Sequence, residues 1–190
     1  MTTLDELVKL KKVRAIGASA MYEYQFRNMQ VIAKKLNLTK FSVMQNYYNL
    51  LYREDERELI PICKQYNVAL VPYSPLAGGH LTHLEWNGDS LRSETDKNLK
   101  SKYDDEKEND LLIINCVHDL AIKYNVSMAQ ISLAWLFKKG VSSAIVGGTK
   151  IKHIKDAIES LNVKLTDNDV KYLEELYKHK PISGARPQGL

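Results

Sequence analysis

The stretch Val71-Pro-Tyr-Ser-Pro-Leu-Ala-Gly-Gly79 decides how this 190-residue sequence is interpreted. It follows a short apolar run that begins at Val68. Prolines fix φ and remove amide donors, and glycines permit positive φ, so a strand must end abruptly here. An aromatic ring, a hydroxyl and a glycine turn at a strand end suit a flat ring joined to phosphates. The sequence therefore predicts a ligand-binding strand end at Tyr73 and Ser74.

Three further apolar strands alternate with helical stretches around this one. The strands are predicted at residues 13–16, 41–44, 68–73 and 143–146. The helices are predicted at residues 3–12, 22–36, 54–66, 108–124, 128–138 and 150–160, with a last one from Thr166 to about Tyr177. Strands that are apolar along their whole length are typical of a parallel sheet covered by helices. We expect four strand–helix units in one domain, with no linker.

Local signals refine the helix ends. Thr3 with Glu6, and Ser127 with Gln130, have the spacing of a capping box. Pro61 interrupts the helical pattern over residues 54–66, which predicts either a kink or a helix that begins later.

Two architectures accommodate four such units: a small open doubly wound sheet, or half of a (β/α)₈ barrel. A whole barrel typically needs about 250 residues, so this chain is too short for one. A doubly wound nucleotide-binding sheet would carry a Gly-x-Gly-x-x-Gly motif after its first strand, and none is present. Both architectures place ligands at the C-terminal ends of the strands.

Composition narrows the class of protein. A hydrophobic content of 44% with 26% charged residues indicates a globular chain rather than a disordered one. The net charge is +4, and the basic residues are spread out, so we expect no nucleic-acid partner. Cys63 and Cys116 form no Cys-x-x-Cys motif and are expected to be reduced core residues. With no signal-peptide pattern and no apolar run of about 20 residues, we expect a cytoplasmic protein without a membrane span.

Short polar groups and glycines follow each predicted strand. These strand ends are Gly17-Ala-Ser19, Gln45-Asn-Tyr47, Tyr73-Ser-Pro-Leu76 and Gly147-Gly-Thr-Lys150. The last leads into a helix whose free amides and positive dipole end favour a phosphate. Ser19 and Gln45 could pair with a carboxamide, and Tyr73 could stack on a flat ring. Each has a structural alternative, as a helix cap, a loop contact, a core residue or a plain turn.

Residues 79–106 show no periodicity, and a stretch of that length is usually functional or mobile. His80 and His83 lie within it and are expected to be surface or loop histidines. Their spacing could serve a metal, but no third ligand is evident.

The sequence resembles the aldo-keto reductases, in their aryl-alcohol-dehydrogenase-like branch, over nearly its whole length to about residue 180. The segments that carry the resemblance are Lys12-Val-Arg-Ala-Ile-Gly-Ala-Ser19, Gln45-Asn-Tyr-Tyr-Asn-Leu-Leu-Tyr-Arg53, Val71-Pro-Tyr-Ser-Pro-Leu-Ala-Gly78, Arg92-Ser-Glu-Thr95 and Ile145-Val-Gly-Gly-Thr-Lys150. The resemblance implies an α/β fold that is the C-terminal half of a (β/α)₈ TIM barrel. It also implies NADP(H) as cofactor and the reduction of aldehydes or ketones, with a carbonyl or alcohol substrate that the sequence does not identify.

The resemblance also implies cofactor contacts, residue by residue. At the nicotinamide and pyrophosphate end, Ser19 and Gln45 would hold the carboxamide, Tyr73 would stack under the ring, and Ser74, Leu76 and Gly78 would line the pyrophosphate. At the adenosine end, Gly147, Thr149 and Lys150 would surround the 2′-phosphate, with His153 and Asp156 near the adenine. Ala20 and Ala157 stand where many relatives have polar residues, which would remove two contacts.

The family's catalytic Asp, Tyr, Lys and His come from the first half of the barrel, so no catalytic residue is predicted in this chain. We expect a partial oxidoreductase domain over residues 1–180 and a tail over 181–190, inactive by itself. A half barrel would also have open sheet edges. The alternative function is therefore a non-catalytic module that associates through these edges with itself or with a full-length relative.

Overall fold

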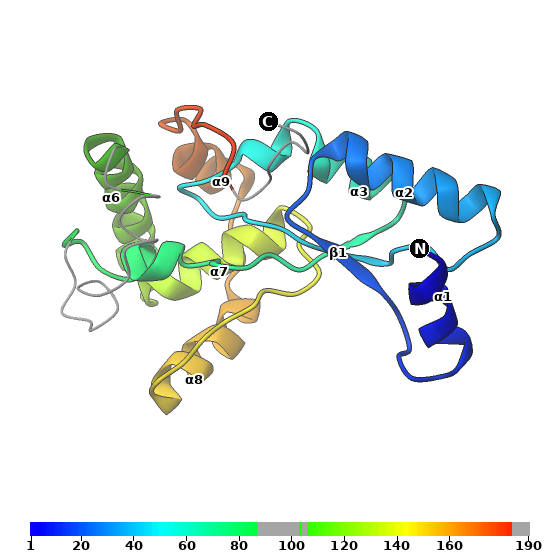
Figure 1. Ribbon diagram of the computed structural model, residues 1–190. Helices are drawn as coiled ribbons and strands as arrows, with labels where there is room; N and C mark the ends of the chain where they lie inside the picture. Colours follow the sequence, from blue (N-terminus) through cyan, green and yellow to red (C-terminus); the bar gives the residue numbers. More distant parts are fainter. Residues whose placement is uncertain (87–102, 104–105, 184–190) are drawn as a thin grey trace.

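The computed structural model describes residues 1–86, 103 and 106–183. Its centre is a parallel sheet in the order β1-β2-β3 (Figure 1), with strands Gly17–Ser19, Val43–Gln45 and Ala69–Leu70. Gly17 pairs with Val43, and Ser19 pairs with Gln45. The spatial order follows the chain order without a reversal. A doubly wound sheet reverses its strand order, whereas a segment of a (β/α)₈ barrel does not. The prediction of a partial barrel is confirmed.

Helices alternate with the strands as far as β3, as the periodicity predicts, and the later helices follow one another without a strand in the described residues. The α-helices are α1 (Thr2–Lys9), α2 (Glu23–Lys35), α3 (Leu59–Gln65), α6 (Lys107–Tyr124), α7 (Met128–Lys138), α8 (Ile151–Glu159) and α9 (Asp167–Glu174). Short 3₁₀ helices are η1 (Glu54–Glu56), η2 (Ala77–Thr82) and η4 (Ser160–Asn162). In the described part of the chain, none of these helices has the length and apolarity needed to cross a membrane.

The first strand lies later in the sequence than predicted. Residues 13–16 form no strand, and Val13 is 38% exposed. Pairing begins at Ile16, whose carbonyl accepts a hydrogen bond from the Ser42 amide at 3.0 Å. The segment Gly17–Ser19, interpreted above as the end of the strand, is β1 itself. An apolar run marks a strand only where a neighbouring strand pairs with it, so the predicted strand began four residues and ended three residues too early.

The predicted fourth strand at residues 143–146 is also wrong. This segment runs alongside β3, where the amides of Ser143 and Ile145 donate to the carbonyls of Leu70 (3.3 Å) and Pro72 (3.0 Å). It is not a strand, because a ladder needs amides from both partners and Pro72 has none. Strand β3 ends after two residues, although the amides of Val71 and Tyr73 still bond to the carbonyls of Met44 (2.9 Å) and Asn46 (2.8 Å).

The predictions for the helix ends had mixed outcomes. The capping boxes at Ser127 and Thr166 hold α7 and α9, and the first was predicted from its spacing. The predicted box at Thr3 is wrong, because α1 begins one residue earlier and has no side-chain cap. The helix predicted over residues 54–66 begins later, at Leu59. Pro61 therefore lies in its first turn, where a missing amide costs little.

One face of the sheet is buried and the other is open. Ala18, Met44 and Leu70 are at most 7% exposed and belong to the hydrophobic core, whereas Ser19 and Gln45 are exposed. Helices α2 and α3 lie side by side above the strands in Figure 1. Cys63 and Cys116 are buried, unbridged thiols, as predicted.

Candidate functional site

The side chains of Ser19 and Gln45 stand together at the C-terminal ends of β1 and β2. The two residues are register partners, and the Ala20 amide bonds to the Gln45 carbonyl at 3.2 Å. Both side chains are exposed and make no hydrogen bond with the described residues. Their hydroxyl and amide groups are therefore available to a ligand.

Tyr73 belongs to a stack of tyrosines. Tyr47 lies between Tyr52 and Tyr73, with ring centroids 4.2 Å and 5.4 Å apart and interplanar angles of 24° and 13°. Tyr47 is 4% exposed, whereas Tyr73 is only partly buried. Tyr73 and Tyr47 also line a cavity of about 120 Å³ with residues of the loops after β1 and β2. Partly buried aromatic side chains of this kind stack on flat rings.

The chain after Tyr73 turns tightly through unusual backbone conformations. Ser74 and Ala77 have φ of 52° and 51°, and Gly78 and Gly79 have φ of 69° and 117°. Left-handed conformations in non-glycine residues cost energy and occur often at functional sites. The Ser74 carbonyl accepts hydrogen bonds from Asn49 Nδ2 at 2.9 Å and from the Ala77 amide at 3.0 Å. The predicted residues Ser74, Leu76 and Gly78 thus share one fixed turn.

The second group of predicted residues surrounds the beginning of α8. Gly147, Thr149 and Lys150 are exposed, and Lys150 is the N-cap. A Cβ atom on Gly148 would lie 2.8 Å from Ile154 Cδ1, so the close approach of loop and helix favours glycine. His153 and Asp156 follow within α8 itself.

Both groups lie at the same edge of the sheet. Residues 143–146 run beside β3 through bonds to Leu70 and Pro72, so Gly147 follows at the level where Tyr73 and Ser74 end their own strand. Unengaged polar side chains at Ser19 and Gln45, open space around Gly147 and a free helix N-terminus fit a nicotinamide dinucleotide.

Of the two histidines of the loop, His83 is partly exposed, as predicted, whereas His80 differs from the prediction. His80 is 7% exposed rather than at the surface, and its ring stacks on Trp86 at 4.3 Å. Among residues 1–86, 103 and 106–183, no three His, Cys, Asp or Glu side chains form a group that could hold a metal. The segment Arg92–Thr95 and the tail from residue 184 lie outside the described residues.

Two features escaped the sequence analysis. One is Asp55, which lines the cavity beside Tyr73. Burial raises the pKa of Asp55 to about 6, although the hydrogen bond from Asn46 Nδ2 at 2.9 Å opposes the shift. The other is Tyr103, which hydrogen-bonds to Tyr47 beneath the strand ends. Neither residue could be singled out from the sequence. Asp55 lies in a run of acidic residues, and Tyr103 lies in the stretch of residues 79–106, which shows no periodicity.

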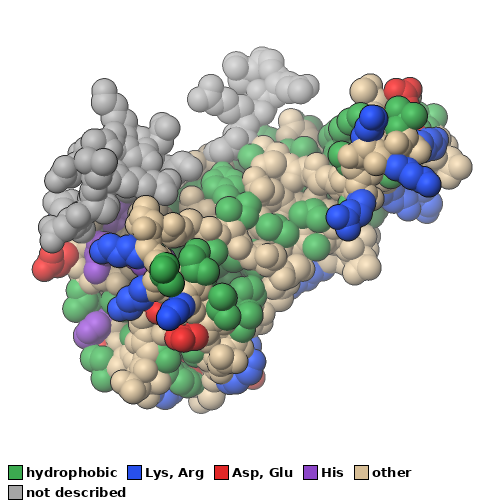
Figure 2. Space-filling view, turned by 90° about the horizontal axis from the view of Figure 1, so that it is seen from below, with side chains coloured by type: hydrophobic (Ala, Val, Ile, Leu, Met, Phe, Trp, Pro, Cys, Tyr) green, Lys and Arg blue, Asp and Glu red, His purple; other side chains and the backbone are tan. Residues whose placement is uncertain are grey.

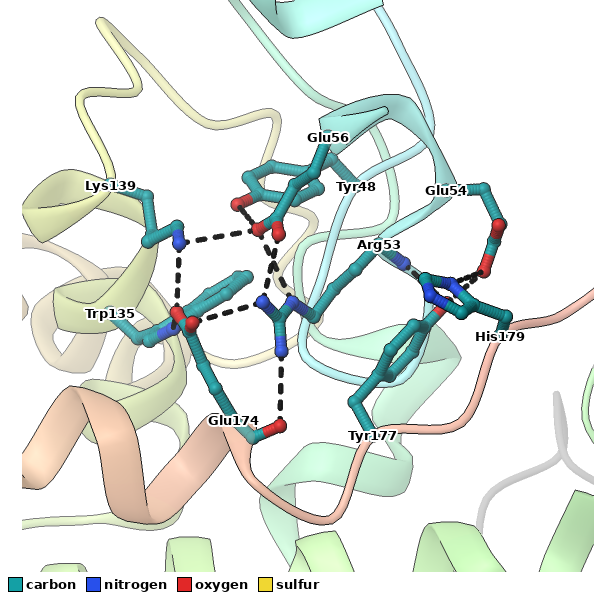
Figure 3. A network of polar contacts seen from close by, with 9 residues as sticks. All are labelled: Tyr48, Arg53, Glu54, Glu56, Trp135, Lys139, Glu174, Tyr177 and His179. Atoms are coloured by element: carbon teal, nitrogen blue, oxygen red, sulfur yellow. Dashed lines mark hydrogen bonds and ion pairs between the residues drawn. The ribbon is translucent and has the colours of Figure 1, made fainter. Parts of the chain in front are cut away.

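A polar network fixes the loop after β2 (Figure 3). This loop contains Tyr47 and Tyr52 of the tyrosine stack. Arg53 bonds to Glu56 at 2.8 Å and to Glu174 at 2.9 Å, and Lys139 pairs with the same two carboxylates. Although burial would lower the pKa of Arg53 and raise that of Glu56, their mutual hydrogen bonds shift both pKa values the other way.

Further contacts extend this network to the chain end. The Trp135 Nε1 donates to Glu174 at 2.8 Å, and Tyr48 donates to Glu56. The Tyr177 hydroxyl accepts from the Arg53 amide and donates to Glu54, each at 2.8 Å. The loop after β2, the end of α7 and the chain after α9 are thereby joined, as Figure 3 shows.

Comparison with known proteins gives a consistent result. The model of the aldo/keto reductase family matches residues 1–178. A protein of Schizosaccharomyces pombe named as a proposed aryl-alcohol dehydrogenase is 46% identical over 97% of this chain and 56% of its own length. The versiconal hemiacetal acetate reductase of Aspergillus parasiticus is 40% identical over 96% and 53%. An aldo-keto reductase of Fusarium vanettenii is 40% identical over 97% and 50%. The chain thus spans about half the length of these curated relatives.

Proposed function

This chain belongs to the aldo/keto reductase family, and from that premise we propose that it is the NADP(H)-binding half of a carbonyl reductase. The observation that carries the proposal is the position of both predicted groups, Ser19–Gln45–Tyr73 and Gly147–Lys150, at one edge of the sheet. Bound NADPH would supply hydride to an aldehyde or ketone. The names of its relatives suggest substrates of the aryl-alcohol type.

The preference for NADP(H) over NAD(H) rests on the cationic start of α8. Lys150 precedes the helix, and Lys152 and His153 follow in its first turn, all exposed. A phosphate at this position would receive the free helix amides and a charge-assisted hydrogen bond from Lys150. The 2′-phosphate is the group that distinguishes the two cofactors, and this end of the site suits it.

Titration of the purified chain with NADPH and NADH, followed by cofactor fluorescence, tests the proposal. NADPH should bind more tightly. Lys150→Ala should weaken NADPH binding by about tenfold to a hundredfold and leave NADH binding unchanged, since a charge-assisted hydrogen bond is worth about 1.5–3 kcal/mol. Lys155→Ala, on the same helix, is the matched control and should change neither affinity. Equal affinities for the two cofactors, or no binding at millimolar concentration, would refute the proposal.

We further propose that this chain alone does not catalyse the reduction of a carbonyl substrate. The family resemblance assigns the catalytic Asp, Tyr, Lys and His to the other half of the barrel, and the relatives are about twice as long. The domain boundary near residue 180 is proposed on the same grounds. A cytoplasmic location is proposed because Cys63 and Cys116 are buried free thiols, which suits a reducing compartment. An NADPH-consumption assay with aromatic aldehydes checks turnover, and measurable activity would contradict this part.

A second candidate function, association through the exposed flanks, is favoured by apolar side chains at the surface. Leu10 at the end of α1 is 68% exposed, and Ile151 and Ile158 of α8 are 77% and 62% exposed. Figure 2 views the molecule from below and shows hydrophobic side chains interspersed with Lys and Arg on the face turned to the viewer. β1 pairs on one side only within the described residues. Sedimentation velocity at micromolar concentration should show a dimer or larger species, and a stable monomer would exclude this function.

A further inference from the structure

Tyr103 is buried beneath the strand ends, far along the chain from the residues that it contacts. It is 2% exposed, and its hydroxyl accepts hydrogen bonds from the Tyr47 hydroxyl and from Asn49 Nδ2, the latter at 3.3 Å. Tyr47 and Asn49 are themselves at most 4% exposed. A shared hydroxyl at the centre of three buried side chains fixes their relative orientation, because each polar group would otherwise lose its partner.

Each partner of Tyr103 contacts a predicted cofactor residue. Tyr47 stacks on Tyr73, which is expected to lie under the nicotinamide. Asn49 Nδ2 also donates to the Ser74 carbonyl at 2.9 Å and so holds the turn expected to line the pyrophosphate. The Asn49 Oδ1 accepts from the Leu51 amide at 2.9 Å, so this amide cannot rotate freely. One hydroxyl therefore supports both the ring and the turn.

We propose that Tyr103 is a positioning residue for the nicotinamide end of the cofactor, acting through Tyr47 on Tyr73 and through Asn49 on Ser74. The inference rests on the proposed function and identifies the residue that sets the geometry of that site. Tyr103 does not touch the cofactor.

The chemistry of the hydroxyl pair is that of a structural hydrogen bond. Burial raises the pKa of both Tyr47 and Tyr103, so both are neutral at physiological pH, and one donates while the other accepts. The groups that face Tyr103 also include Asp110 and Lys180, which pair with each other at 2.6 Å. Lys180 Nζ lies 6.0 Å from the Tyr103 ring centroid.

The ring of Tyr103 is packed independently of its hydroxyl. His80 lies 5.2 Å away between ring centroids, at an interplanar angle of 59°. Phenylalanine at position 103 would keep this packing and remove only the hydroxyl. Tyr103→Phe is therefore the sharpest available change. Tyr48→Phe is the matched control, because Tyr48 is 1% exposed and bonds to Glu56 in the network of Figure 3, away from Tyr73.

The experiment measures two affinities for each variant of the full chain. NADPH reports the whole cofactor site, and 2′,5′-ADP reports the adenosine end alone. Tyr103→Phe should weaken NADPH by about threefold to tenfold, the value of one neutral hydrogen bond, and leave 2′,5′-ADP unchanged. Tyr47→Phe removes the other hydroxyl of the same pair. The double variant should be no weaker than Tyr103→Phe alone, because loss of the Tyr103 hydroxyl already removes the one bond that Tyr47→Phe removes.

The outcomes separate this inference from the proposed function. If the unmodified chain binds neither ligand, the proposed function fails and the inference with it. If it binds both, equal NADPH affinity for the unmodified chain and Tyr103→Phe overturns the inference alone. A parallel loss of 2′,5′-ADP affinity, or an equal loss in Tyr48→Phe, would mean that the hydroxyl serves general stability and would also overturn it. If Tyr103→Phe does not fold, Tyr47→Phe answers the same question.

Discussion

The network around Arg53 and the region around α8 differ in how their charged residues are placed. Those of the network are largely buried and paired, whereas those of α8 are mostly exposed. In the network, Arg53 is 11% exposed and every carboxylate has a cationic or hydroxyl partner. In α8, no residue is buried, and isoleucines and lysines share the surface. Buried charged groups need ionic or hydrogen-bond partners within the protein, whereas exposed ones are solvated and remain available to a ligand. The first region fixes the fold, and the second is free to bind.

The largest effect on the contrast between the two regions is expected from Arg53→Ala. The free energy of unfolding should fall by about 3–5 kcal/mol, because Glu56 and Glu174 would remain partly buried without their main partner. Urea denaturation followed by circular dichroism measures the loss. The matched control is Arg27→Ala, whose exposed pair with Glu23 should contribute less than about 0.5 kcal/mol. Equal losses in the two variants would show that the network is not structurally special.

A pH series on Asp55→Asn tests the intermediate case, a buried carboxyl beside the cavity. Because the folded-state pKa of Asp55 is raised to about 6 from 3.8, the folded state holds this proton more tightly than the unfolded state. Its contribution to stability is therefore present below about pH 4 and is lost as the pH rises through about 6. Asp55→Asn should match the unmodified chain at pH 4 and exceed it by about 1–3 kcal/mol at pH 7.5.

The control for this series is Asp167→Asn. Lys138 lowers the pKa of Asp167, and the Asp167 side chain is 93% exposed, so little change is expected at any pH. Thermal melts of the three proteins between pH 4 and 8 give the comparison. If Asp55→Asn were destabilised at pH 7.5, the carboxylate would be favourable where it lies.

The smallest effect on stability is expected in the exposed helix α8. Ile158 of α8 is 62% exposed, so Ile158→Ala should change the free energy of unfolding by no more than about 0.5 kcal/mol. Ile131 of α7 is fully buried, and Ile131→Ala should cost about 2–5 kcal/mol. A large loss in Ile158→Ala at high protein concentration that vanishes on dilution would instead reveal an association surface. Denaturation at two concentrations distinguishes these cases.

Much of the candidate site follows from local pattern. Tyr73, the glycines after it and the Gly147–Lys150 turn are recognisable because proline and glycine fix where a strand ends. The pairing of Ser19 with Gln45 could be anticipated, since parallel strands bring their C-terminal ends to one edge. The strand limits at residues 13–16 and 143–146 could not, because a ladder depends on both partners, and Pro72 withholds the amide that one of them needs.

The sequence alone determined the order of the helices, the presence of a parallel sheet between the first of them, and the family, because each depends on residues close together in the chain. Only the tertiary structure decided that Tyr103 supports Tyr47, that Arg53 reaches Glu174 and that Asp55 loses its solvent. These contacts join residues about 56 to 121 positions apart, or depend on what covers a side chain. No local pattern records them, because burial and pairing across the fold are properties of the packed chain.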